Sequence, residues 1–116
     1  MQPTIRLCKF TDLVDGASRG FDPHNEGQDS VIVVRRGNEA RVYRDRCPHQ
    51  GNPMAPNKDK YLNADKTEIV CWAHGARFAV DTGACTAGPC MGESLRALPH
   101  RIDAEGFLCL IGGPHT

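Results

Sequence analysis

The sequence has few aromatic residues, no excess of charge of either sign and no long hydrophobic run. Phe, Trp and Tyr make up 6% of the 116 residues, and there is one Trp. Lys and Arg together number 14, as do Asp and Glu, so the formal net charge is zero. This balance provides no electrostatic attraction to nucleic acid or to an anionic membrane, and we expect neither as a partner.

The N-terminal segment also lacks the features of an exported or membrane-anchored protein. Charged residues begin at Arg6 and Lys9, and no apolar run is long enough for a signal peptide or a membrane span. We therefore predict a cytoplasmic protein. The length suits one domain, residues 1–116, with no room for a second catalytic domain.

The sequence does have six cysteines and five histidines. In a secreted protein, six cysteines would indicate a disulfide framework, but in a reducing compartment they more often bind metal. Cys8 and Cys109 lie in apolar, strand-like runs, and we interpret them as small core residues. Cys85 and Cys90 lie in a loop-like stretch with Gly and Pro, and we expect no role for them in the cytosol.

Short alternating and β-branched runs separated by turn residues predict an all-β fold. A hairpin is expected where Ser30–Arg36, which contains Val-Ile-Val-Val, is followed by a Gly-Asn turn. The predicted strands cover residues 4–9, 30–36, 40–45, 67–70, 77–80, 94–98, 101–104 and 107–111, and we predict turns or loops at 12–20, 46–63 and 84–93.

Two loop segments each carry one cysteine and one histidine close together. One residue separates Cys47 from His49, two residues separate Cys71 from His74, and a glycine follows each pair within two residues. Glycine lets the backbone approach closely and direct its N–H groups toward a charged sulfur site. Two such loops can enclose a small metal cluster with two thiolate and two imidazole ligands.

These residues form the pattern Cys-Pro-His-x-Gly, then Cys-x-x-His-Gly-x-x-Phe, Asp-x-Gly and Gly-Pro, which resembles the Rieske ferredoxin family over nearly the whole chain. The resemblance implies one [2Fe-2S] cluster, because family members hold one iron through two cysteines and the other through two histidines. Cys47 and Cys71 would bind the inner iron, and His49 and His74 the outer one.

The resemblance also implies the Rieske iron–sulfur fold. In that fold an antiparallel β-sandwich forms a basal part, into which a smaller cluster-binding subdomain is inserted. We expect residues 1–44 and 86–116 to form the basal part and residues 45–85 the cluster-binding part.

The function that the resemblance implies is electron transfer, not catalysis. Soluble Rieske ferredoxins take one electron from a flavin-dependent NAD(P)H reductase and pass it to a terminal oxygenase, and we expect those two partners here. The chain is too short to carry the oxygenase's own iron site. The alternative is a small subunit of a larger reductase, such as an assimilatory nitrite reductase, with or without a cluster.

Within the pattern, this sequence departs from the high-potential, quinol-oxidising members. Asn52 and Ala73 stand where those proteins have a disulfide, and Ala76 and Phe78 stand where they have hydroxyl groups. Fewer donors to sulfur stabilise the reduced state less, so we expect a potential of about −150 mV. The spacer between the two ligand pairs is longer than usual, with the excess in residues 57–66, where a surface loop accommodates it at little cost.

Zinc is the other metal to consider for two cysteines and two histidines. Zinc sites usually open with two cysteines two to four residues apart, which a Cys-x-His pair does not match. Trp72, inside the second ligand loop, is either a docking anchor for a redox partner or a lid over the cluster, and the sequence does not decide between them.

Overall fold

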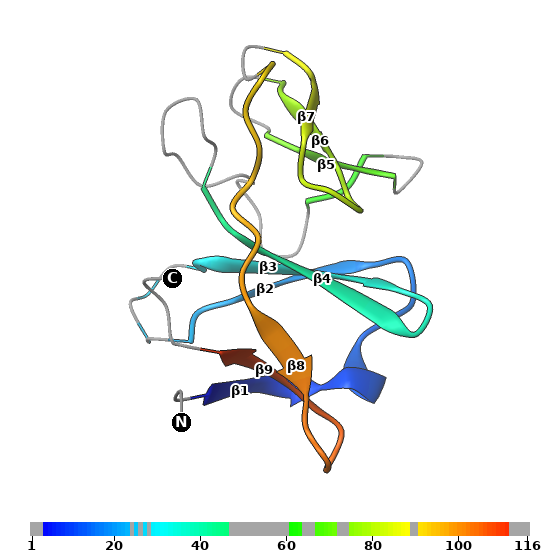
Figure 1. The fold of residues 1–116 in the computed structure, drawn as a ribbon, viewed down its shortest axis with the longest axis vertical. Coiled ribbons are helices and arrows are strands. Elements are labelled where there is room, and N and C mark those ends of the chain that lie inside the picture. The colour runs from blue at the N-terminus through cyan, green and yellow to red at the C-terminus, as the bar shows by residue number, and fades with distance from the viewer. Residues whose placement is uncertain are drawn as a thin grey trace.

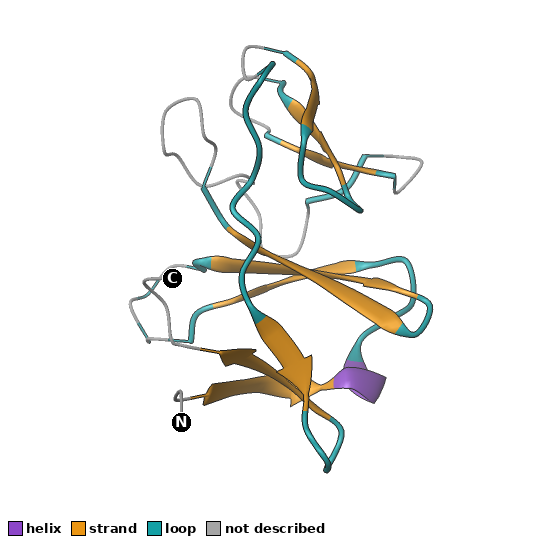
Figure 2. Cartoon of the chain, in the orientation of Figure 1, coloured by secondary structure: helices purple, strands orange, loops and turns teal. Residues whose placement is uncertain are grey.

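The computed structural model describes residues 4–23, 25, 27, 29–46, 61–63, 67–71, 75–88 and 91–111. In these residues the chain forms three antiparallel sheets of three strands each and a short 3-10 helix, η1 (Phe10–Asp12), as Figures 1 and 2 show. The predicted all-β fold is confirmed. No helix among the described residues is long and apolar enough to cross a membrane.

The first sheet joins the two ends of the described chain. It contains β1 (Thr4–Lys9), β9 (Phe107–Ile111) and β8 (His100–Ile102), in the order β1-β9-β8. β1 lies at an edge of this sheet, and its alternating pattern is typical of a strand with one face exposed to water. The pairing of β1 with β9 shifts register between Arg6 and Cys8.

The second sheet contains β2 (Ser18–Phe21), β3 (Val31–Arg36) and β4 (Glu39–Arg44), with β3 in the centre. β3 and β4 form the predicted hairpin. Gly37 in its turn has a φ of +62°, a left-handed conformation that favours glycine.

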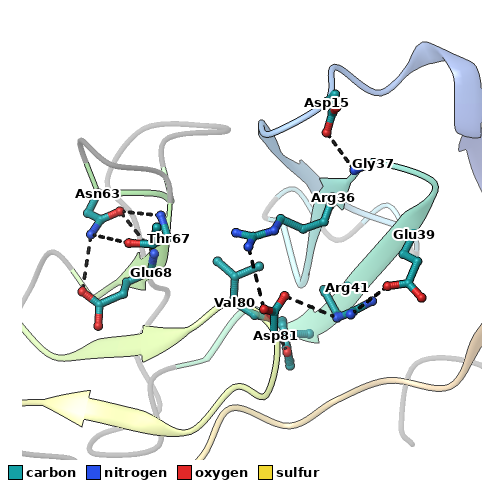
Figure 3. A network of polar contacts seen from close by, with 11 residues as sticks. Asp15, Arg36, Gly37, Glu39, Arg41, Asn63, Thr67, Glu68, Val80 and Asp81 are labelled. Carbon is teal, nitrogen blue, oxygen red and sulfur yellow. Dashed lines mark hydrogen bonds and ion pairs between the residues drawn. The ribbon is translucent and has the colours of Figure 1, made fainter.

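The third sheet contains β5 (Glu68–Val70), β6 (Arg77–Ala79) and β7 (Cys85–Ala87). Residues 61–63 run beside β5, where Leu62 forms a bridge with Ile69. Oδ1 of Asn63 accepts the N–H groups of Thr67 and Glu68 over 3.0 and 3.2 Å and so holds the start of β5 (Figure 3).

The second sheet lies between the other two (Figure 1). Alternate residues of β3 therefore face different cores. Val31 and Val33 belong to the core shared with the first sheet, whereas Ile32 and Val34 belong to the core shared with the third. Burial on both faces explains why Val-Ile-Val-Val is continuously apolar.

Polar contacts fasten the third sheet to the hairpin of the second. Asp81, in the turn after β6, pairs with Arg36 over 3.8 Å and with Arg41 over 3.9 Å (Figure 3). Beneath them the buried Tyr43 hydroxyl donates to the Val80 carbonyl oxygen over 2.6 Å. The exposed ion pairs contribute little, so the buried hydrogen bond is the stronger of these links.

The chain leaves the second sheet and returns to it at one place. The N–H of Arg44 donates to the carbonyl oxygen of Arg96 over 2.9 Å, and the N–H of Leu98 donates to that of Val42 over 2.9 Å. Tyr43 and Ala97 form an antiparallel bridge between these two bonds. The outgoing segment 42–44 and the returning segment 96–98 therefore form a two-stranded neck.

Three predictions about strands were wrong. β2 and β7 fall in segments predicted as turn and loop, and each pairs with a longer or better-patterned neighbour. Residues 94–98 form no strand and make only single bridges, Ser94 with Ala84 and Ala97 with Tyr43. This segment crosses from the third sheet to the first, so it has no single partner along its length.

Candidate functional site

Of the four predicted ligands, the structure describes Cys71, while Cys47, His49 and His74 lie outside the described residues. Cys71 follows β5 directly, and its side chain is 0% exposed. It belongs to the core between the second and third sheets, together with Ile69. The cysteine side chain is therefore held out of water at the end of a strand.

The chain after Cys71 turns back on itself. The Gly75 N–H donates to the Cys71 carbonyl oxygen over 2.7 Å, and the Cys71 N–H donates to the Ala76 carbonyl oxygen over 2.8 Å. Gly75 has a φ of +75°, which other residues adopt only with strain. The glycine after the second Cys/His pair thus serves to close this loop.

Gly88, just after β7, packs against the same loop. Its φ is +93°, and a Cβ at this position would lie 2.7 Å from the Ala76 Cα atom. Both features require glycine, because the clash is with backbone and cannot be relieved by rotating a side chain. Close packing here holds the end of β7 against the 71–76 loop.

Two buried apolar side chains lie beside the Cys71 loop. Ala76 and Phe78 are both 0% exposed and belong to the same core cluster as Cys71. Neither carries a hydroxyl group. The two side chains therefore add apolar surface, and no hydrogen-bond donor, to the surroundings of the thiol.

The structure also contains a buried polar contact that we did not predict. The Tyr61 hydroxyl donates to Oδ2 of Asp45 over 3.0 Å, and both side chains are buried. Asp45 comes directly before segment 46–63, whose polar texture predicted a loop, and Tyr61 lies within that segment near its end. The sequence offers one signal of this contact, which is that Tyr61, one of only two tyrosines, lies in a polar stretch.

The other described cysteines behave as core residues. Cys109 is buried, which confirms our interpretation, and Cys8 packs at the margin of the core between the first and second sheets. Burial raises the pKa of both thiols, so they remain protonated near neutral pH. Cys85 is buried, with its thiol 3.2 Å from the Ala87 carbonyl oxygen, and Cys90 lies outside the described residues.

The described part of the site fits an iron–sulfur cluster. A thiolate ligand needs protection from water and a backbone that can approach closely, and Cys71 and its glycine-closed loop have both properties. The donor set in the sequence, two cysteines and two histidines, matches the ligands of a cluster that combines both residue types.

The described residues form an all-β protein with a buried cysteine at the end of the third sheet, and the sequence carries two Cys/His pairs, which are the ligand types of a Rieske-type iron–sulfur cluster. The model of the Rieske [2Fe-2S] domain matches residues 4–101. The chain belongs to the Rieske [2Fe-2S] domain family, and its cofactor is accordingly one Rieske-type [2Fe-2S] cluster.

The most similar known proteins include ferredoxins of oxygenase systems. The ferredoxin component of biphenyl 2,3-dioxygenase from Rhodococcus jostii (strain RHA1) is 28% identical over 96% of this chain and 95% of that protein. The ferredoxin component of the alkene monooxygenase system from Xanthobacter autotrophicus (strain ATCC BAA-1158 / Py2) is 29% identical over 93% of this chain and 80% of that protein.

A solved structure agrees with these sequence matches. The ferredoxin of carbazole 1,9a-dioxygenase from Nocardioides aromaticivorans IC177 superimposes with a TM-score of 0.67 at 30% identity, covering 93% of this chain and 95% of that one. The likeness thus extends over nearly the full length of both chains.

Proposed function

We propose that this chain is a Rieske ferredoxin that carries single electrons and binds its cluster through Cys47, His49, Cys71 and His74. The observation that carries the proposal is the position of Cys71, buried at the end of β5 and held by a glycine-closed loop. When bound, the cluster takes up and releases one electron at a time. The division into a basal part, 1–44 and 86–116, and a cluster-binding part, 45–85, belongs to the same proposal.

In this proposal the chain's own residues supply the surroundings of the cluster. The hydrogen bonds of the 71–76 loop keep the Cys71 backbone in place, and Gly88 brings the end of β7 against it. Ala76 and Phe78 exclude water on the same side. A rigid environment that excludes water lowers the reorganisation energy of a change in charge, and a lower reorganisation energy favours rapid electron transfer.

The partners that we propose are a flavin-dependent NAD(P)H reductase as donor and a terminal oxygenase as acceptor. The relatives named as ferredoxin components of a dioxygenase and a monooxygenase system support this assignment. The chain is then the electron-transfer part of a multicomponent system and not itself an enzyme. The cytoplasm, predicted from the N-terminal sequence, is the location that we propose for it.

The test of the cofactor and its ligands is an electron paramagnetic resonance spectrum of dithionite-reduced protein, with iron and acid-labile sulfide measured on the same anaerobic sample. A rhombic signal with an average g below the free-electron value, and equal amounts of iron and sulfide, is expected. In His74→Cys the spectrum should approach that of an all-thiolate cluster and the potential should fall. Zinc, or no metal, in the wild-type protein would contradict the proposal.

The partners are tested by electron delivery. NAD(P)H and a flavoprotein reductase should reduce the protein, and a Rieske-dependent terminal oxygenase with its substrate should then reoxidise it. The Cys71→Ser variant should transfer no electrons from the reductase to the oxygenase. Reoxidation only by a nitrite reductase would instead establish the alternative, a subunit of a larger reductase. A wild-type cluster that no flavoprotein reduces would refute the proposed donor.

A further inference from the structure

Tyr61 lies at the junction of the second and third sheets and contacts both. Its side chain is 2% exposed and packs in the core with Ile69 and Phe78. Its hydroxyl donates to Oδ2 of Asp45 over 3.0 Å, and its carbonyl oxygen accepts the N–H of Val70 over 2.8 Å. One residue therefore joins the end of the second sheet to the last residue of β5.

The two residues that Tyr61 joins each lead into a proposed ligand loop. Asp45 comes two residues before Cys47, and Val70 comes directly before Cys71. Asp45 is 5% exposed, and its own N–H donates to the Ser30 carbonyl oxygen over 2.8 Å, so it is anchored to the second sheet. Tyr61 therefore contacts the residues that lead into both loops.

The second sheet is shaped to receive this phenol at Gly20 of β2. A Cβ at position 20 would lie 2.6 Å from the Tyr61 hydroxyl oxygen and would also collide with the carboxyl group of Asp29. Gly20 is not among the residues with positive φ, so its backbone does not require glycine. The absence of a side chain at Gly20 is instead explained by the space that the Tyr61 hydroxyl and the Asp29 carboxyl group occupy together.

We propose that Tyr61 is a positioning residue for the cluster, whose hydrogen bond to Asp45 sets the spacing of the two ligand loops. This inference rests on the proposed function, because it assumes that Cys47 and Cys71 are ligands. A buried hydrogen bond to a carboxyl group is among the stronger ones in proteins, and the low dielectric around it strengthens it further. Loss of the hydrogen bond between Tyr61 and Asp45 allows the segments that lead into the two ligand loops to move apart. The cluster is then released more readily.

The chain offers a matched control in its other tyrosine. Tyr43 is 3% exposed, and its hydroxyl also links the second and third sheets, by donating to the Val80 carbonyl oxygen over 2.6 Å. Val80, however, follows β6 and leads into the Asp81 turn, away from either ligand loop. Tyr43→Phe and Tyr61→Phe thus delete the same group from equally buried sites, and only Tyr61→Phe alters a segment that leads into a ligand loop.

The experiment compares iron release to a chelator, the electron paramagnetic resonance spectrum of the reduced protein and the thermal unfolding midpoint in both variants. Tyr61→Phe should release iron about tenfold faster than wild type and should shift or broaden the g values. Tyr43→Phe should lower the unfolding midpoint by a similar amount while keeping the wild-type release rate and spectrum.

Replacements of Asp45 test the hydrogen bond from its other end. Asp45→Asn keeps an oxygen that can accept the Tyr61 hydroxyl, so it should release iron at close to the wild-type rate. Asp45→Ala should release iron at least as fast as Tyr61→Phe, and the double variant should show less than the sum of the two effects, because both substitutions remove the hydrogen bond between Tyr61 and Asp45.

Equal iron release in Tyr61→Phe and Tyr43→Phe, with unchanged g values, would overturn the inference and leave Tyr61 a purely structural residue. That result is distinguishable from failure of the proposed function. If wild-type protein holds no [2Fe-2S] cluster, the ligand assignment fails and this inference fails with it. If the wild-type cluster is present and Tyr61→Phe is indistinguishable from it, only the positioning role is wrong.

Discussion

Ala76 and Phe78 supply no side-chain hydrogen-bond donor to the surroundings of Cys71. Both are buried beside Cys71, and neither has a hydroxyl group. Ala76→Ser should raise the reduction potential above the expected value of about −150 mV, because a donor to sulfur stabilises the reduced state. Voltammetry measures the change, and Ala87→Ser on the exposed end of β7 is the control; an equal or lower potential in Ala76→Ser would contradict the interpretation.

A comparison of Gly88 with Gly92 distinguishes two costs to the free energy of unfolding: that of a side chain at positive φ and that of a side chain in a closely packed place. Their φ values are +93° and +91°, but a Cβ at Gly88 meets the Ala76 backbone whereas one at Gly92 meets nothing within 4 Å. Gly92→Ala should lower the free energy of unfolding by about 1 to 3 kcal/mol. Gly88→Ala should cost about 1 to 3 kcal/mol more. Equal losses in thermal or urea unfolding would show that the contact with Ala76 relaxes freely.

For single residues, the sequence predicts the local structure of a short motif but not the contacts between residues that are far apart in the chain. The spacing of Cys71 and His74, with glycine after them, was enough to propose a ligand loop, and the structure gives Gly75 the left-handed conformation that such a loop needs. The contact between Tyr61 and Asp45 spans 16 positions through a segment without periodicity. No local pattern encodes it, because it depends on how two sheets pack.

Among the elements, the strands with a strong pattern of their own were predictable and those formed by pairing were not. Val31–Val34 is β-branched and apolar throughout, so β3 is evident from the sequence. β2 reads Ser-Arg-Gly-Phe and β7 reads Cys-Thr-Ala, and neither alternates clearly. Both exist because β3 and β6 offer them hydrogen-bonding partners. Tertiary context, not local propensity, decides such short strands.

The turn between β8 and β9 depends on a carboxylate. The Phe107 N–H, together with the Glu105 N–H and the Arg6 guanidinium, holds the pKa of Asp103 below its ordinary value against the opposing effect of burial. Because the folded-state pKa is depressed, this contribution to stability is present above the unfolded pKa of about 4 and is lost as pH falls through the folded value.

Asp103→Asn tests this linkage. The variant should be less stable than wild type at neutral pH, and the difference between them should shrink as pH falls below about 4, since the asparagine does not titrate. Urea unfolding of both proteins from pH 7 downward measures the difference in their free energies of unfolding. Both proteins lose the cluster in acid, so that loss does not contribute to the difference. A difference that stays constant with pH would show that the charge of Asp103 does not stabilise the turn.

Across the whole molecule, the third sheet should depend on the cluster more than the other two do. Its strands have three residues each, whereas β3 and β4 have six and are packed on both sides by other elements. Metal binding contributes to folding where the ligands are, and β5 leads directly into Cys71, one of the four proposed ligands. The stability of the molecule is therefore expected to be uneven along the chain.

Removal of iron should destabilise the third sheet more than the other two sheets. Amide hydrogen exchange, followed by mass spectrometry, should accelerate first in residues 68–87 and leave β3 and β9 protected. The cluster-loaded protein is the reference, and Tyr43→Phe, expected to keep its cluster, controls for a general loss of stability. An even rise in exchange over all three sheets would mean that the chain unfolds as one unit when iron is lost.

The two-stranded neck has a consequence for how such a protein varies over evolution. Arg44 and Arg96 are hydrogen-bonded neighbours, so everything between them begins and ends at one point of the second sheet. Residues gained or lost in the loops of that interval, outside β5, β6 and β7, change the loop length and leave both ends in place. Related proteins can therefore differ in the length of these loops while the first and second sheets stay the same.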